Sequence, residues 1–244
     1  MKTTIVIPTY NEAENLKKLV SELMKIPEIN LLIVDDNSPD GTGQIADELK
    51  QELNGRLDVL HRAGKQGLGT AYIQGFQYAI QQGADAVGQM DADFSHPIDK
   101  LPIMMELLPA YDFVLGSRYV PGGSLDERWP FWRKFLSGFG NVYARVILGM
   151  SIRDVTGGYR LWKRETLQGM PLERVRSNGY IFQVEMAYLA SKLGYFCKET
   201  PIHFADRRWG KSKMSFRIQI EAAIRTWVLL TRYRDLQKKL TMRK

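Results

Sequence analysis

Short apolar runs alternate with helical patterns through the first half of the chain, and this alternation constrains the fold more than any other feature. The runs have the length and composition of strands that are buried on both faces. They span Thr4–Ile7, Leu31–Val34, Leu57–Leu60, Ala86–Met90 and Phe113–Leu115. Helical patterns separate them, at Ala13–Met24, Gly43–Leu53, Gly69–Gln82 and Asp99–Leu108. The alternation predicts an α/β fold in which helices flank a mostly parallel central sheet.

Polar clusters directly follow four of these runs. They begin at Pro8, Asp35, Asp91 and Gly116. Each cluster alone could be turn chemistry, because Asn, Asp, Pro and Gly commonly end strands and cap helices. Ligands of parallel sheets bind beyond the carboxyl ends of the strands, so four such clusters predict one shared ligand site.

Asp91 and Asp93 form the cluster with the clearest chemistry. Two carboxylates one residue apart at a strand end suit a hard divalent cation, Mg²⁺ or Mn²⁺, that bridges phosphate oxygens. Such an ion neutralises the charge of a leaving diphosphate. The alternative is a cap for the helix at Asp99–Leu108, and the strand-end context favours the metal site.

Two other segments resemble known loops only in part. Asp36 opens a pattern like an EF-hand calcium loop, but it follows a β-like run, so we expect it to contact a nucleoside, with Asp40 to Thr42 forming a turn and helix cap. Gly67 to Ala71 lacks the spacing of a dinucleotide-binding fingerprint and predicts a tight helix entry near the shared ligand site.

These segments together resemble the family 2 inverting glycosyltransferases, and more narrowly the polyprenol-phosphate (dolichol-phosphate) mannose synthases. The resemblance covers about residues 4 to 215 and rests on eight segments in family order. They are Val6–Glu12, Val34–Thr42, Lys65–Ala71, Met90–Pro97, Gly116–Tyr119, Asp154–Leu161, Gly179–Glu185 and Asp206–Lys213.

The resemblance implies a Rossmann-like nucleotide-diphospho-sugar transferase fold of the GT-A type. It also implies transfer of mannose from GDP-mannose to a polyprenyl (dolichyl) phosphate with inversion, giving polyprenyl-phosphate β-mannose and GDP. Two alternatives stay open: a UDP-glucose-dependent polyprenyl-phosphate glucosyltransferase, and a non-catalytic module that binds nucleotide or nucleic acid.

Carried over by position, the resemblance implies catalytic roles for Asp91, Asp93 and Arg118, with the two aspartates as metal ligands. The implied donor contacts are Pro8, Tyr10, Glu12, Val34, Asp36, Asp91, Ala92, Asp93, Arg118, Arg207 and Lys213. The basic cluster that contains the last two residues also predicts a phosphate clamp by its composition, with a solvated loop as the alternative. Ser95 stands where some relatives have Gln, so sugar contacts there do not carry over.

A phosphate acceptor removes the need for a protein base. Its second pKa is roughly 6, so it is already largely an anionic nucleophile near neutral pH. Asp154 and Glu185 are the acidic residues that could otherwise serve as a base.

Two segments predict contact with a lipid surface. Arg128, Trp132, Arg133 and Lys134 combine cations with an aromatic ring, and Phe216–Leu230 has an apolar helical stripe. A helix of ~15 residues is ~22 Å long, too short to span a bilayer but able to lie in its interface. We therefore expect a catalytic domain at residues 1–215, followed by an amphipathic helix and basic tail at 216–244. Core packing or subunit pairing is the alternative for this helix.

Composition indicates the compartment. Cys197 is the single cysteine, the N-terminus lacks a signal-peptide pattern, and no run of 18 apolar residues occurs, unlike relatives with C-terminal transmembrane helices. We expect a cytoplasmic protein on the cytoplasmic face of a membrane, with a separate membrane-anchoring protein as a further expected partner.

The net charge of +7 is concentrated in Arg217–Lys244, which holds eight Lys and Arg against two acidic residues. Anionic lipid, nucleic acid and water are each compatible with such a tail. Because the tail does not interleave aromatic and basic residues, we expect no nucleic-acid partner.

Overall fold

The computed structural model describes residues 1–206 and 216–237. The strands are β1 (Thr3–Thr9), β2 (Ile29–Asp35), β3 (Leu57–His61), β4 (Ala86–Gln89), β5 (Phe113–Ser117), β6 (Ser124–Leu125), β7 (Arg160–Lys163), β8 (Cys197–Pro201) and β9 (His203–Phe204). The helices are α1 (Ala13–Leu23), α2 (Thr42–Glu52), α3 (Leu68–Gln81), α4 (Leu101–Leu107), α5 (Phe131–Ile147), α6 (Arg164–Gly169), α7 (Tyr180–Leu193) and α8 (Phe216–Arg232). The five strands and four helices expected in the first half are confirmed, with ends that differ by a few residues.

A seven-stranded sheet forms the centre of the molecule, in the order β3-β2-β1-β4-β7-β5-β8. All neighbouring pairs are parallel except those of β7, which runs antiparallel to both β4 and β5. The predicted mostly parallel sheet is therefore confirmed. The strand order reverses between β1 and β4, and such a switch point opens a crevice at the carboxyl ends of the strands.

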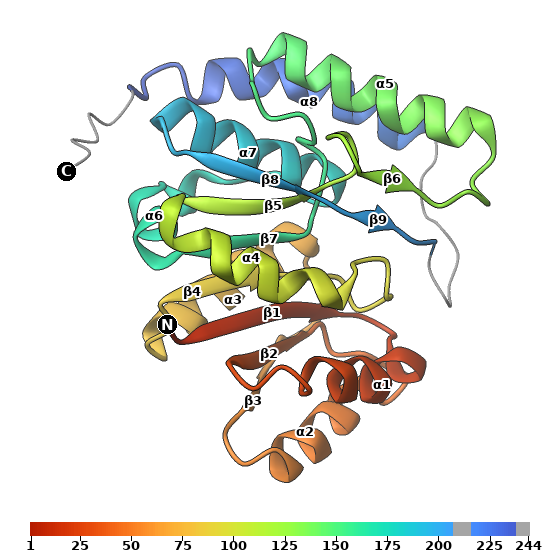
Figure 1. The fold of residues 1–244 in the computed structure, drawn as a ribbon, viewed down its shortest axis with the longest axis vertical. Coiled ribbons are helices and arrows are strands. Elements are labelled where there is room, and N and C mark those ends of the chain that lie inside the picture. The colour runs from red at the N-terminus through yellow and green to blue at the C-terminus, as the bar shows by residue number, and fades with distance from the viewer. Residues whose placement is uncertain (207–215, 238–244) are drawn as a thin grey trace.

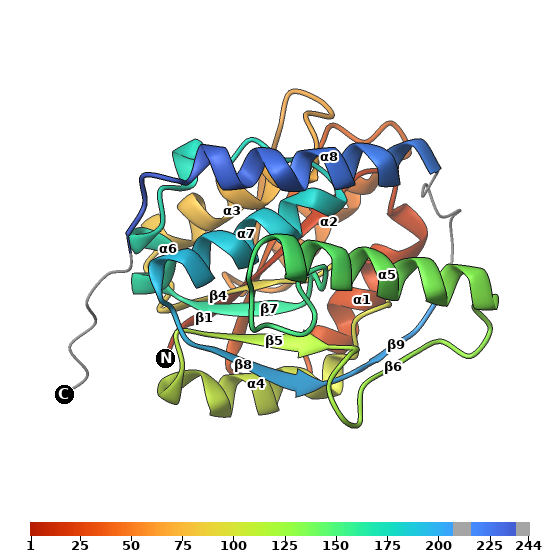
Figure 2. The same ribbon diagram turned by 90° about the horizontal axis from the view of Figure 1, so that it is seen from above.

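Helices cover both faces of the sheet, and each face has its own core (Figures 1 and 2). In β1, Val6 points into the core shared with α3 and α7, whereas Ile5 and Ile7 point into the core shared with α1 and α4. Successive side chains of a strand face opposite ways, so a strand buried on both faces must be apolar throughout. This explains the uninterrupted apolar runs of the sequence.

The second half of the chain departs from the regular alternation. The short strand β6 lies between β5 and α5, and the long helix α5 contains Trp132, Arg133 and Lys134. Strand β7 enters the sheet between β4 and β5 through pairing partners far away in the sequence. Neither α5 nor β7 was predicted. The pairing that places β7 is long-range and leaves no local signal, whereas α5 was missed although its aromatic residues recur at every fourth position from Phe131.

Helix α8 packs against α5 and α7. Its Leu229, with Tyr233 just after the helix, is buried in the same core as the α7 side chains. Within the described residues, no helix is both long and apolar enough to cross a membrane.

Candidate functional site

A pocket of about 190 Å³ lies at the switch point between β1 and β4. We call it the switch-point pocket. It is lined by Pro8, Thr9, Tyr10, Glu12, Asp36, Lys65, Gly67, Leu68, Ala71, Asp91, Ala92 and Asp93. The carboxyl ends of β1, β2 and β4, together with the entry to α3, thus supply one site from four distant parts of the sequence.

The loops that leave β1, β2 and β4 turn sharply through left-handed residues. Asn11, Asn37 and Phe94 have φ angles of 60°, 55° and 63°. Asn tolerates this region, whereas a bulky residue such as Phe94 pays a strain of about 1–2 kcal/mol there. Strained backbone of this kind occurs often at ligand sites, and here it follows directly after Asp93.

Asp35 and Asp40 organise the loops beside the pocket. Asp35 accepts hydrogen bonds from the Thr9 hydroxyl at 2.9 Å and from the Ser38 hydroxyl at 2.6 Å. Asp40 accepts from the Ala13 N–H and from both the N–H and hydroxyl of Thr42. The predicted turn at Asp40 is confirmed, and these two aspartates hold the loops rather than line the pocket.

Asp36 is buried beside a cation. Arg62 Nη1 lies 2.9 Å from Asp36 Oδ1, but the geometry is not that of a hydrogen bond, so this oxygen has no donor among the described residues. Burial raises the pKa of Asp36 above its usual value, although Arg62 opposes the shift. The carboxylate can therefore accept an N–H or O–H group from a nucleoside. Lys65 and Tyr10 both line the pocket, and Lys65 Nζ lies 4.0 Å from the centroid of the Tyr10 ring.

Two buried side chains orient Asp91. The Tyr72 hydroxyl donates to Asp91 Oδ1 at 3.1 Å, and the Asp91 N–H donates to His96 Nδ1 at 3.1 Å. Tyr72 stacks on Phe182, and His96 stacks on Tyr159. Both orienting groups are thus fixed by aromatic packing.

Asp93 is held by its own loop. Its Oδ1 accepts hydrogen bonds from the N–H and hydroxyl of Ser95. The next helical turn begins at Ile98 after Pro97, with no side-chain cap, so the helix-cap alternative for the two aspartates is wrong.

The donor set at Asp91 and Asp93 fits a hard divalent cation, because both are carboxylates that line the pocket in hydrogen-bonded positions. No group of three or more His, Cys, Asp or Glu side chains suited to a metal occurs in the described part of the chain. A cation at this place would need oxygen ligands from its substrate or from water.

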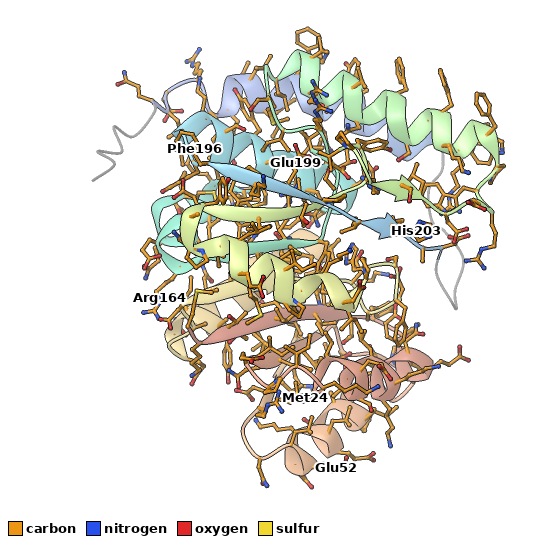
Figure 3. The ribbon with its side chains drawn as sticks, in the orientation of Figure 1. Met24, Glu52, Arg164, Phe196, Glu199 and His203 are labelled. Atoms are coloured by element: carbon orange, nitrogen blue, oxygen red, sulfur yellow. The ribbon has the colours of Figure 1, made fainter. Side chains whose placement is uncertain are left out.

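Arg118 makes a buried ion pair that the sequence did not reveal. Its Nε and Nη2 donate to the Asp154 carboxylate at 2.8 and 2.7 Å, and Nη2 also donates to the Thr156 hydroxyl. Burial alone lowers the pKa of Arg118, but the Asp154 carboxylate outweighs burial and raises it. The pKa of Asp154 is lowered in turn, since Arg118 outweighs its burial. Glu199 of β8, labelled in Figure 3, accepts the N–H of Asp154 and anchors the pair.

The predicted donor residues fall into three groups. Seven of them line the switch-point pocket: Pro8, Tyr10, Glu12, Asp36, Asp91, Ala92 and Asp93. Val34 is fully buried in the core beneath the pocket, and Arg118 lies outside the lining in its ion pair. Arg207 and Lys213 fall outside the described residues.

The predicted acceptor residues lie at the start of α5. Arg128 pairs with Asp126, and Lys134 donates to the Glu127 carbonyl. Trp132 is exposed. Arg133 stacks 3.7 Å over Trp129 and pairs with Asp206 at 3.4 Å, just before the undescribed basic segment.

Several residues with roles in the site were not predicted. Lys65 lines the pocket and Arg62 pairs with Asp36, and Tyr72 and His96 orient Asp91. Lys65 and His96 lie within segments that carry the family resemblance, which was the one available signal for them. Tyr72 had none, because its hydroxyl reaches Asp91 only through the packing of α3 on the sheet.

The sequence matches the family model "Glycosyl transferase family 2" over residues 4–170. The chain belongs to this family and is a glycosyltransferase. This membership decides against the non-catalytic binding module.

Two curated relatives match over most of their length. An undecaprenyl-phosphate mannosyltransferase of Micrococcus luteus is 42% identical over 98% of this chain and 99% of its own. A polyprenol monophosphomannose synthase of Mycolicibacterium smegmatis is 44% identical over 88% of this chain and 81% of its own.

Solved structures share the fold at low sequence identity. Mannosyl-3-phosphoglycerate synthase from Rubrobacter xylanophilus has a TM-score of 0.69 at 17% identity, covering 100% of this chain and 77% of its own. A mannosyltransferase from Pyrobaculum calidifontis, in complex with GDP-Man and Mn²⁺, has a TM-score of 0.62 at 18% identity, covering 98% of this chain and 66% of its own. These likenesses confirm the predicted GT-A-like fold.

Proposed function

We propose that this glycosyltransferase moves mannose from GDP-mannose to a polyprenyl phosphate, with inversion from α to β and release of GDP. The observation that carries the proposal is the pair of aspartates, Asp91 and Asp93, which follow β4 and line the switch-point pocket together with Asp36. The names of the two curated relatives support mannose as the sugar and a polyprenyl phosphate as the acceptor.

Asp91 and Asp93 would hold Mg²⁺ or Mn²⁺, and Tyr72, His96 and Ser95 keep the two carboxylates in place. When bound, the cation supplies Lewis-acid stabilisation of the leaving diphosphate. The donor's own phosphate oxygens would complete its ligands. Arg118, Arg207 and Lys213 remain our candidates for contacts to donor or acceptor phosphate.

The acceptor phosphate, already anionic, would attack the sugar directly. The two acidic residues considered as a base are both engaged elsewhere: Asp154 by Arg118, and Glu185 by Arg232 and Tyr233. Their engagement supports a reaction in which the chain positions the reactants and takes no proton from the nucleophile.

We further propose that the enzyme binds the cytoplasmic face of a membrane through α5 and α8. Phe131, Phe135, Phe139 and Tyr143 form a stacked row along α5 with centroids 6.2 to 6.4 Å apart, and its three Phe rings are exposed. Figure 3 shows rings standing on the outer face of this helix. We call this row the aromatic ladder.

Helix α8 extends the same surface. Its Ile224, Trp227 and Val228 are exposed, and Trp227 Nε1 donates to the Tyr143 hydroxyl at 2.8 Å. Lys134 brings positive charge to the start of the ladder, which an anionic lipid surface attracts, whereas the charge of Arg128 is compensated by Asp126. A separate anchoring protein could use the same surface.

The test of the reaction is an incubation of pure protein with radiolabelled GDP-mannose, Mg²⁺ or Mn²⁺ and polyprenyl phosphate, followed by lipid extraction. We expect labelled lipid from the wild type and none above background from Asp91→Ala or Asp93→Ala. UDP-glucose in parallel, with thermal shifts by GDP and UDP, distinguishes the glucosyl alternative. Folded wild-type protein that labels no lipid with either donor would sink the proposal.

A further inference from the structure

Glu185 of α7 is a fully buried carboxylate outside the lining of the switch-point pocket. Its Oε2 accepts the N–H of Ser177 at 2.8 Å and of Arg176 at 3.3 Å. Its Oε1 accepts the Tyr233 hydroxyl at 2.8 Å and Arg232 Nη1 at 2.5 Å. One side chain thus joins the segment before α7 to the end of α8.

The segment held by Glu185 presses against the entry to α3. A Cβ atom on Gly69 would lie 2.3 Å from the Ser177 carbonyl oxygen, and one on Gly67 would lie 2.7 Å from the Asn178 side chain. At Gly69 the two backbones lie in direct contact without an intervening side chain, so the position of Gly69 depends on that of Ser177. Gly67 and its neighbour Leu68 line the switch-point pocket.

A second set of contacts ties the same region to α8. Arg174 pairs with Asp235 at 2.7 Å, donates to the Arg232 carbonyl at 2.5 Å and lies over the Tyr233 ring. The opposite face of α8 carries the exposed Trp227 next to the aromatic ladder. Helix α8 therefore touches the outer apolar surface on one side and the Glu185 network on the other.

We propose that Glu185 is a positioning residue that holds residues 176–178 against the entry to α3 at residues 67–69. It thereby couples the position of α8 on the domain to nucleotide binding in the switch-point pocket. The inference rests on the proposed use of the switch-point pocket by the donor nucleotide. A buried carboxylate with four donors specifies one arrangement, because any slippage leaves buried N–H groups or the charge itself without partners. An apolar side chain at this place would allow α8 to slide.

Three variants separate this coupling from general stability. Glu185→Gln keeps the volume of the side chain but replaces one accepting oxygen with an NH₂ group. Each carboxylate oxygen accepts from two donors, so in either orientation the NH₂ group faces two donors that it cannot accept from. Tyr233→Phe removes a single hydroxyl and leaves the ion pair with Arg232. Tyr143→Phe is the matched control, since it removes the hydrogen bonds of the Tyr143 hydroxyl with Trp227 and with the Ala223 carbonyl of α8 but leaves the Glu185 network, which carries the proposed coupling, intact.

The measurements are GDP affinity with Mn²⁺ by calorimetry, amide hydrogen exchange across the whole chain, and the thermal unfolding midpoint. We expect Glu185→Gln to weaken GDP binding about tenfold, and Tyr233→Phe to weaken it less. Exchange should accelerate selectively at residues 67–70 and 176–178 in both variants. Tyr143→Phe should match the wild type in GDP affinity and in exchange at these residues.

Two results would overturn the inference: unchanged GDP affinity and 67–70 exchange in folded Glu185→Gln, or faster exchange spread evenly over the molecule. If Glu185→Gln does not fold, the selectivity of Tyr233→Phe against Tyr143→Phe decides by the same criteria. A wild type that binds neither GDP nor UDP would refute the proposed function. The exchange comparison would still test the coupling.

Discussion

The backbone N–H of Asp91 donates a hydrogen bond to Nδ1 of His96 at 3.1 Å. This bond connects Asp91, a proposed metal ligand, to an imidazole ring that is buried and stacked on Tyr159. Burial lowers the pKa of His96, although the carboxylates of Asp91 and Asp93 oppose the shift. The ring is therefore neutral near pH 7, with Nδ1 as acceptor.

Replacing His96 should reduce activity through the position of Asp91. We expect His96→Ala to lower kcat/KM by about 10- to 100-fold, as is typical for groups that orient metal ligands. His96→Asn, whose side-chain oxygen can replace Nδ1 as acceptor, should keep more of the activity. Steady-state kinetics with GDP-mannose check this, and equal losses in both variants would mean that ring packing, not the hydrogen bond, matters.

The Tyr72 hydroxyl should raise the affinity of the site for its cation. Tyr72→Phe removes the hydrogen bond to Asp91 Oδ1 and should weaken Mn²⁺ binding in the presence of GDP by about tenfold. Titration followed by the electron paramagnetic resonance of free Mn²⁺ measures it. Tyr78→Phe is the control, because this residue lies on the same helix but bonds to Asp58. Equal Mn²⁺ affinities in the two variants would contradict the role of Tyr72.

The ion pair of Arg118 and Asp154 should contribute stability that depends on pH. Arg118 lowers the pKa of Asp154 below its ordinary value of 3.8, so the stabilisation is complete above that value and is lost as pH falls through the folded-state pKa. At pH 7, Asp154→Asn should cost roughly 3 kcal/mol, because it leaves a buried guanidinium without its charge partner.

Denaturant unfolding of wild type and Asp154→Asn from pH 7 down to pH 2 tests this linkage. The two stabilities should draw together as pH drops below 3.8, because the carboxyl of the unfolded chain then takes up a proton that the folded carboxyl, with its lowered pKa, takes up only at a still lower pH. A difference that stays constant over the whole range would exclude the ion pair as its source.

The aromatic ladder should bind lipid. Phe135→Ser combined with Phe139→Ser should lower partitioning onto anionic vesicles by about tenfold or more. Burial of each ring in the lipid would contribute roughly 1 kcal/mol or more to the free energy of binding. Flotation of protein with vesicles measures the change. Ile103→Ser, at an exposed apolar residue of α4, should leave it unaltered.

Light scattering provides the counter-test for this surface. If α5 and α8 pair two copies of the chain instead, the wild type will be a dimer, the double variant a monomer, and wild-type partitioning weak. That outcome would replace the lipid surface with a subunit interface.

Local sequence patterns were sufficient for the first half of the fold. The strands β1, β2, β4 and β5 are buried on both faces, so each must be an apolar run, and such runs are visible in the sequence without knowledge of their partners. Three of the four polar clusters also met as expected, because the carboxyl ends of β1, β2 and β4 lie at one edge of the sheet, whereas the cluster that begins at Gly116 does not line the pocket.

The same patterns failed where long-range contacts decide the structure. Strand β7 is antiparallel within a sheet whose other pairs are parallel, and its place depends on partners in β4 and β5. Helix α5 was missed although Phe131, Phe135 and Phe139 recur with helical spacing, and only the structure shows that this apolar stripe faces outward, unlike the buried stripe of an ordinary surface helix.

By itself, then, the sequence determined the α/β class, the family and the two aspartates as candidate metal ligands, since these depend on periodicity and on residues close together in the chain. Only the tertiary structure decided which groups act on those aspartates and which are engaged elsewhere. Tyr72 reaches Asp91, Asp154 pairs with Arg118, and Glu185 joins α7 to α8. Each of these relationships joins residues that are distant in sequence, and their geometry exists only once the helices have packed on the sheet.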